Sequence, residues 1–491
     1  MGARRVRERT RIDASWIIAC EGGQHRLLKD GVVVFEGDRI LHVGRRFDGH
    51  VDRTIAAHGK VVTPGFVSTH AHIAYNPLGK SLIEDRGQPQ LYYSPLYEDL
   101  PIQVFSQDEG GDQACVEISM VELLRSGCTT VCELQTSLSS RPGIDAVARE
   151  AIKIGMRAYL GCSFRSAHWS IPDGHTVSFK WDLEGGKAGL RRAREIIEHW
   201  EGAGDDTIRG MLAPAHSCDL SAELVEDTRR LAEELDVPVT IHCSESVFEF
   251  QEMLRRHGKT PIEWLRDLGF LSPRVILGHA IHIGGTSWTN YPAGDLDIMA
   301  RTGVSVSHSP WSFFRRGVML ESFARYARAG IPLSLGTDLT PQSSLNSLRF
   351  GACIGKAVER DNFAVTAADM FDAATLGGAR ALGRDDLGRI AAGAKADLVF
   401  WDAATLTMAP LRDPVKNIVY SAETSDVVGV IVNGRTVMDD RRVLAAEPDH
   451  VLAARLQAAG ERLWSRIENF DRERRSADGF SPQTYPEWQG A

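Results

Sequence analysis

Two histidines one residue apart end the apolar segment PGFVSTHAH, residues 64–72. If this segment is a strand, His70 and His72 point to the same side of it, because side chains alternate between the two faces of a strand. Both imidazoles could then bind one metal ion. The spacing alone does not establish a metal site, since an isolated pair of this kind is more often buried or solvent-facing histidine without a metal.

Three further residues of ligand type also lie at the ends of apolar segments. They are His242 in TIHCSE, His279 in LGHAIH and Asp338 in SLGTD. Imidazole and carboxylate groups suit zinc or another divalent transition-metal ion, with an open position left for water. The hypothesis of a metal centre therefore depends on whether the fold gathers these strand ends around one point.

Eight short apolar segments alternate with helix-like stretches such as AELVEDTRRLAEEL between about residues 63 and 388. The segments are GFVSTHAH, CTTVCELQT, RAYLGCSF, RGMLAPAH, VPVTIHCSE, RVILGHAIH, VSVSHSP and IPLSLGTD. This pattern predicts an α/β fold, a (β/α)₈ TIM barrel with parallel strands covered on both faces. The candidate ligands fall at the C-terminal ends of the segments, where barrels of this kind carry their chemistry.

Both ends of the chain have a different sequence pattern, with short β-rich segments separated by turns. Together they predict one small β-sandwich built from both termini. The expected organisation is an N-terminal part of the sandwich in 1–62, the metal-dependent barrel in 63–388, the C-terminal part of the sandwich in 389–446, and a helix with a tail in 447–491. The segment DHVLAARLQAAGERLWSRIENF reads as an amphipathic helix that could serve a subunit interface.

Composition excludes several classes of function. The chain has 491 residues and a net charge of −9, with no extended basic block, so no nucleic-acid partner is expected. No segment approaches the roughly 18 apolar residues of a membrane span, and no apolar stretch follows the basic N-terminus as in a secretory signal. The eight cysteines are scattered. We therefore expect a cytoplasmic enzyme with reduced thiols and a small-molecule substrate.

Six motifs in order resemble those of the amidohydrolase superfamily over about residues 16–446. They are PGFVSTHAH, HCSE, GHAIH, HSP, LGTD and ATLGGARALGRDDLGRIAAGAKADLVFWD. The resemblance implies that His70, His72, His242 and Asp338 bind metal, and that His279 binds metal or polarises the substrate. The fourth segment, RGMLAPAH, lacks the lysine that carries the bridging carbamate of binuclear members, so one divalent ion is expected, zinc before cobalt, manganese or iron. Relatives are often dimers or larger, which implies a homo-oligomer.

The chemistry expected of this set is hydrolysis. A bound cation lowers the pKa of water toward ~7, and Asp338 can take the proton of that water. His279 can stabilise charge that grows on the attacked group. Glu245 follows His242 by three residues and resembles the proton shuttle of the family's aminohydrolases. The alternative for Glu245 is a surface carboxylate at the start of a helix.

Aromatic residues are frequent in the loops on the predicted active-site rim. We expect Tyr93, Trp169 and Trp311 to line an apolar pocket, with His308 beside the substrate. Arg315 and Arg316 either bind an anionic group or are solvated charges at a helix start.

The segments YNPLGKSLIED, WSFFRRGVMLESFARY and GTDLTPQSSLNSLR resemble the branch that contains molinate hydrolase and the phenylurea hydrolases, and more distantly the triazine hydrolase and aminohydrolase branch. This implies cleavage of an amide, urea, carbamate or thiocarbamate bond in a small aromatic or heterocyclic substrate. The alternative is an aminohydrolase or dehalogenase that acts on a nitrogen heterocycle. A catalytically inactive scaffold is disfavoured, because every expected ligand is present.

Overall fold

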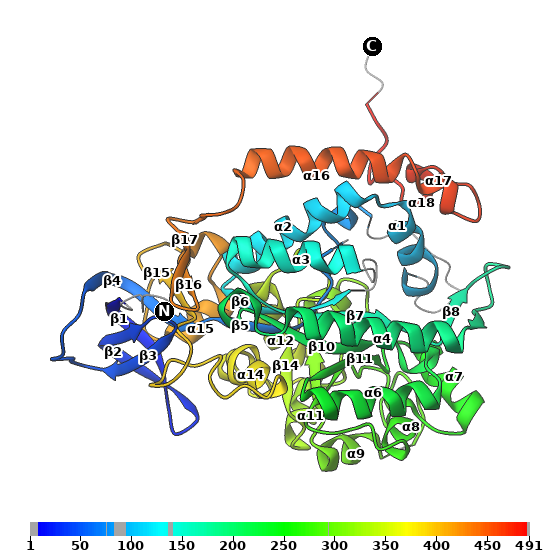
Figure 1. The fold of residues 1–491 in the computed structure, drawn as a ribbon, viewed down its shortest axis with the longest axis horizontal. Helices are drawn as coiled ribbons and strands as arrows, with labels where there is room; N and C mark the ends of the chain where they lie inside the picture. The colour runs from blue at the N-terminus through cyan, green and yellow to red at the C-terminus, as the bar shows by residue number, and fades with distance from the viewer. Residues whose placement is uncertain (1–7, 75, 83–94, 136–140, 293, 489–491) are drawn as a thin grey trace, which may run out of the picture.

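The computed structural model describes residues 8–74, 76–82, 95–135, 141–292 and 294–488. It consists of a barrel surrounded by helices and, at one side of the barrel, a smaller sheet formed by both ends of the chain (Figure 1). No helix among these residues is both long and apolar enough to cross a membrane.

The barrel is a closed ring of eight parallel strands, and each strand coincides with one of the eight predicted segments. In barrel order they are β10 (Ile208–Pro214), β11 (Val239–Cys243), β12 (Val275–His279), β13 (Ser305–His308), β14 (Leu333–Leu335), β5 (Phe66–Ala71), β6 (Cys128–Gln135) and β7 (Arg157–Phe164). The predicted TIM barrel is confirmed. Consecutive strands are adjacent, so their C-terminal ends form one rim.

Amphipathic helices cover the outside of the barrel. In α6, for example, Ser221 caps the first turn by accepting a hydrogen bond from Leu224 N, and the apolar face with Val225 and Leu231 is buried. The covering helices are α2 (Glu109–Arg125), α3 (Arg141–Ile154), α4 (Leu183–Trp200), α6 (Ala222–Leu235), α7 (Val247–His257), α8 (Pro261–Asp267), α9 (Asp295–Thr302), α11 (Phe323–Arg328) and α12 (Ser344–Glu359).

Shorter elements decorate the C-terminal rim of the barrel. After β5 come η1 (Asn76–Gly79), η2 (Pro95–Asp99) and α1 (Leu100–Ser106); after β7, the hairpin of β8 (Ala167–Ser170) and β9 (Ser178–Trp181); after β10, η3 (Ser217–Asp219); and after β13, α10 (Pro310–Phe314). The chain then leaves the barrel through α13 (Ala367–Asp372), η4 (Ala373–Gly377) and α14 (Gly378–Ala381). These rim elements are the parts of the fold placed to contact a substrate.

The smaller unit is one hydrogen-bonded sheet with the order β18-β17-β16-β15-β4-β1-β2-β3. Its strands are β1 (Arg9–Glu21), β2 (Gln24–Glu36), β3 (Arg39–Gly44), β4 (Arg53–Pro64), β15 (Leu398–Asp402), β16 (Val427–Val432), β17 (Arg435–Asp439) and β18 (Arg442–Val443). The two ends of the chain meet where β4 and β15 pair antiparallel, Val62 opposite Phe400. The expectation that both termini share one β unit is therefore confirmed. Gly65 alone separates β4 from β5, and a Cβ there would lie 2.0 Å from Thr129 Oγ1.

The C-terminal segment packs against helices of the barrel. Helix α16 (Asp449–Trp464) lies along α2 (Figure 1), and α17 (Ile467–Phe470) and α18 (Ala477–Phe480) follow. Leu463 and Phe480 are buried in one apolar cluster with Leu78 and Cys115. Part of the apolar face of α16 is thus covered within the chain itself.

Candidate active site

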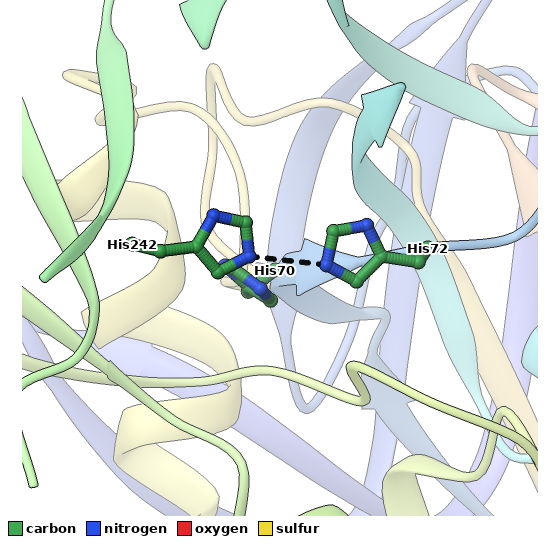
Figure 2. A group of neighbouring side chains, drawn as sticks. All are labelled: His70, His72 and His242. Atoms are coloured by element: carbon green, nitrogen blue, oxygen red, sulfur yellow. Dashed lines mark hydrogen bonds between the residues drawn. The ribbon is translucent and has the colours of Figure 1, made fainter. Parts of the chain in front are cut away.

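The candidate ligands converge at the C-terminal rim, as their positions at strand ends predict. Figure 2 shows His70 from β5 and His72, directly after β5, beside His242 from β11. The Nε2 atoms of His72 and His242 lie 3.2 Å apart. The Asp338 Oδ1 atom lies 3.7 Å from Nε2 of both His70 and His72. The ligand atoms of His70, His279 and Asp338 lie within 4.8 Å of one another, as do those of His70, His72 and His242.

Backbone hydrogen bonds fix Asp338 against β5. Its N–H donates to His70 O at 2.9 Å, and His72 N–H donates to Asp338 O at 2.9 Å. This arrangement requires a left-handed backbone at Asp338, with φ 54°, which few non-glycine residues adopt. Such a conformation persists only where the surroundings over-determine it, and it is frequent at functional sites.

Two of the histidines are oriented by main-chain carbonyls. His72 Nδ1 lies 2.9 Å from Leu134 O, and His242 Nδ1 lies 2.9 Å from Ala215 O. A carbonyl can only accept, so each Nδ1 carries the proton and each Nε2 presents a lone pair. Two lone pairs facing each other at 3.2 Å repel unless a cation or a proton lies between them. A zinc ion bound to both at about 2.1 Å in tetrahedral geometry would separate them by about 3.4 Å, so the pair fits a metal.

Neither ring nitrogen of His70 or His279 has a hydrogen-bond partner among the described residues, although both rings are buried. Burial lowers the pKa of both, so both are neutral imidazoles with a lone pair to offer. Buried polar atoms almost always have a hydrogen-bond partner. The four ring nitrogens without one therefore indicate a bound ligand at this place. Gly278 permits the crowding, because a Cβ there would lie 2.6 Å from His70 Nδ1.

Glu245 lies at the same rim and is buried, so it is not a surface carboxylate. His216 Nε2 donates to Glu245 Oε2 at 3.2 Å, and the His216 ring stacks on His242 with centroids 4.5 Å apart. Burial lowers the pKa of His216, but its contacts with Asp219 and Glu245 outweigh this and raise that pKa to about 9. Burial conversely raises the pKa of Glu245, and His216 outweighs it, so the carboxylate is ionised. The two groups form a buried ion pair.

The importance of His216 was missed in the sequence. It lies two residues after β10, the fourth barrel strand along the chain, and that position was the available signal, but its partner Glu245 lies 29 residues away. Two further residues hold the Glu245 segment in place, and neither belongs to a recognisable sequence motif. Glu249 accepts a hydrogen bond from Glu245 N at 2.8 Å, and Tyr97 shares a 2.6 Å hydrogen bond with the next residue, Ser246. Tyr97 belongs to η2, so the segment after β5 is anchored beside the site.

A cavity of about 450 Å³ opens onto these residues. His72, His242, Glu245 and Asp338 form its inner wall. Its outer wall is largely apolar and includes Leu82, Leu96, Leu100, Val104, Phe105, Phe164, Trp169 and Leu339. The volume and lining are typical of a site for a small organic molecule.

Of the four residues expected to line the pocket, one lines the described cavity, two do not, and one lies outside the described residues. Trp169 lines the cavity and meets the His216 ring edge-on at 4.8 Å. Trp311 is not among the described lining residues, because its ring stacks on Phe350 of α12 at 4.7 Å. His308 is buried, its pKa lowered to about 3 by burial, and it too lies outside the described cavity wall. Tyr93 falls outside the described residues.

Comparison with known proteins identifies the family. The family model described as the amidohydrolase family matches residues 61–437. The chain belongs to the amidohydrolase family. It is 31% identical to a 5′-deoxyadenosine deaminase of Methanothermobacter thermautotrophicus over 88% of this chain and 95% of that protein. Its fold matches an adenosine deaminase of Xanthomonas campestris with bound zinc at 25% identity and a TM-score of 0.78, over 92% of this chain and 98% of that one.

A second solved structure, an atrazine chlorohydrolase of Arthrobacter aurescens TC1 complexed with zinc, shares the fold with a TM-score of 0.78 at 23% identity, over 92% of this chain and all of that one. The protein is thus a metal-dependent amidohydrolase, an enzyme that acts on carbon–nitrogen bonds other than peptide bonds. The expected superfamily is confirmed.

Proposed function

We propose that the protein is an aminohydrolase, which replaces an amino group on a ring carbon of a nitrogen heterocycle by hydroxyl and releases ammonia. The observation that carries this proposal is the buried Glu245–His216 pair beside the candidate metal ligands. Loss of ammonia requires proton delivery to a poor leaving group, and a carboxylate at this place can provide it. The deaminase relatives support this alternative better than the leading expectation of amide, urea, carbamate or thiocarbamate cleavage.

The ligand set proposed for the metal is His70, His72, His242 and Asp338. Three neutral imidazoles and one carboxylate match the donor chemistry of zinc. The buried ring nitrogens of His70, which have no hydrogen-bond partner among the described residues, also support a bound metal. A bound divalent cation supplies a water of lowered pKa and withdraws charge from the attacked group. We propose zinc, because the deaminase with the same fold was solved with zinc bound.

Each neighbouring side chain has a role that follows from its position. Asp338, at 3.7 Å from two of the proposed ligands, accepts the proton of the attacking water. Glu245 is ionised, so it can take the other proton of that water and carry it to the ring nitrogen, while His216 holds its carboxylate in place. The proton accepted by Asp338 is then available for the leaving amino group. His279 is neutral because burial lowers its pKa, and it faces the developing charge as a hydrogen-bond donor or as a further ligand.

The rest of the cavity suits an aromatic ring. Trp169 is fixed edge-on between His216 and Tyr97, whose ring centroid lies 5.3 Å away. Leu96 and Phe164 extend the apolar wall. A planar heterocycle placed there gains apolar burial while its exocyclic nitrogen points to the polar inner wall.

The experiment is a substrate panel with the zinc-loaded protein. The panel contains 5′-deoxyadenosine, an aminotriazine, an N-aryl urea and an N-aryl carbamate, and both ammonia and aryl amine are measured. We expect ammonia from a heterocycle and its loss in Glu245→Gln, while Glu233→Gln on the surface of α6 serves as the matched control. Cleavage of the urea or carbamate with no ammonia from any heterocycle would overturn the proposal.

A further inference from the structure

The cavity has an unequal distribution of charge. Its described lining contains two carboxylates, Glu245 and Asp338, and both belong to the inner wall that carries the proposed metal ligands. The remaining charged side chains of the described wall are basic: His216, which pairs with Glu245, and the four arginines Arg165, Arg192, Arg315 and Arg316. Away from the reacting end, the described wall is therefore positively charged. A concave site with walls of one sign concentrates the field and favours a ligand of the opposite sign.

The segment after β13 holds two of these arginines in a fixed place. Phe313 is buried with its ring 4.4 Å from that of His279, and Trp311 stacks on Phe350. The helix α10 is thus fastened on one side to the site and on the other to α12. Arg315 and Arg316 follow directly at its C-terminal end and line the cavity.

Arg316 is the arginine whose charge is available to a ligand. Its Nη1 donates to Ser312 O at 2.6 Å and lies 3.2 Å from Ser312 Oγ, both neutral acceptors. No carboxylate of the described chain lies within ion-pair distance of it. A guanidinium has five N–H donors, so most of its donors are left for another partner. It is partly buried, so its interactions are less screened than those of a surface arginine.

Arg165 on the opposite wall is already engaged. Its Nη1 lies 3.6 Å from Asp219 Oδ2, and its guanidinium carbon lies 5.2 Å from the centre of the Trp169 ring. Asp219 is fully buried and also faces His216. Arg165 therefore balances the charge of Asp219, whereas Arg316 faces no carboxylate among the residues that the structure describes.

We propose that Arg316, with Arg315 beside it, binds an anionic group on the substrate, such as a carboxylate or a phosphate. The inference rests on the proposed function and deepens it: the heterocycle whose amino group is removed carries a negative charge at the end remote from the reacting carbon. A guanidinium suits this task because its planar fork can donate two parallel hydrogen bonds to a carboxylate or phosphate.

The test compares two probes of nearly the same shape, nicotinate with a carboxylate and nicotinamide with a neutral amide. Their dissociation constants are measured by calorimetric titration for the zinc-loaded and the metal-free protein. We expect nicotinate to bind at least about tenfold more tightly than nicotinamide in both forms. Arg316→Gln should reduce this preference to about twofold or less, Arg316→Lys should retain most of it, and Arg229→Gln on the surface of α6 should leave it unchanged.

Three results would overturn the inference. The wild-type protein could show no preference for the anion, the preference could survive in Arg316→Gln, or it could vanish when zinc is removed, which would mean that the carboxylate binds the metal. Thermal unfolding checks that each variant folds, and Arg316→Met replaces Arg316→Gln if the latter does not. The probes bind without reacting, so absence of ammonia release in the substrate panel would refute the aminohydrolase and leave this result standing.

Discussion

Substitution of Gly278 by alanine tests the proposed metal centre without removing any of its proposed ligands. The added methyl carbon would lie 2.6 Å from Nδ1 and 2.7 Å from Cε1 of His70. Ordinary contacts between such atoms begin at about 3.4 Å, so the imidazole must move by about 0.8 Å. The ring cannot move freely, because His70 is fully buried and its backbone carbonyl is held by Thr337 N and Asp338 N.

Two separate costs follow from this displacement. Overpacking of a dense interior costs roughly 1–3 kcal/mol of folding free energy. A ligand moved by nearly 1 Å loses metal affinity, and disturbance of groups that orient ligands typically costs about 10–100-fold. We therefore expect Gly278→Ala to weaken zinc binding by one to two orders of magnitude. Activity at limiting zinc should fall with it and should recover in part at excess zinc.

Zinc affinity is measured by competition with a chromophoric chelator, and stability by thermal unfolding with and without zinc. The matched control is Gly294→Ala, because a Cβ at Gly294 meets nothing within 4 Å and its φ is negative. The control should bind zinc as the wild type does. If Gly278→Ala keeps wild-type zinc affinity, or if both variants lose it equally, the proposed role of His70 as a tightly packed ligand is refuted.

Three further outcomes are expected. Glu245→Gln should lower kcat for ammonia release by about 10²–10⁴-fold with zinc content unchanged, and a loss of zinc would show that Glu245 acts as a ligand instead. Asp338→Ala should abolish turnover while circular dichroism stays native, so retained activity would exclude it as the base. Burial lowers the pKa of His25 to about 4. Folding therefore favours its neutral form, and up to about 3 kcal/mol of stability is lost as pH falls from 6.5 toward 4. In urea titrations this loss should be smaller in His25→Gln, and an equal loss in both proteins would contradict the assignment.

The barrel could be predicted because its signals are local. Each strand is a short apolar segment followed by an amphipathic helix, and eight repeats of that unit close into one architecture. The convergence of His70, His72, His242 and Asp338 then follows from topology, since parallel strands present their C-terminal ends at one rim. The shared sheet of the two termini was predictable for the same reason, because both segments have the pattern of short strands and turns.

The support of the site could not be predicted, because it depends on contacts between distant residues. Nothing in the sequence pairs Glu245 with His216, or Tyr97 with Ser246. Trp311 is a residue that the sequence placed in the pocket but that distant contacts direct elsewhere. Its place after the seventh strand suggested the pocket, but packing against Phe350 turns it toward α12. Which way a rim side chain faces is decided by the neighbouring helix and not by the motif.

The proposed metal site and the outer part of the cavity are formed by different parts of the fold. His72, directly after β5, is oriented by the Leu134 carbonyl on β6, and His242 on β11 is oriented by the Ala215 carbonyl directly after β10. Each of these two proposed ligands is thus oriented from the adjacent strand, so closure of the barrel itself sets the direction of both imidazoles. The residues that would meet the substrate, such as Trp169 and Arg316, lie on rim segments that take no part in that closure. Under the proposed function, changes in these rim segments should therefore alter the preferred substrate at little cost to metal affinity.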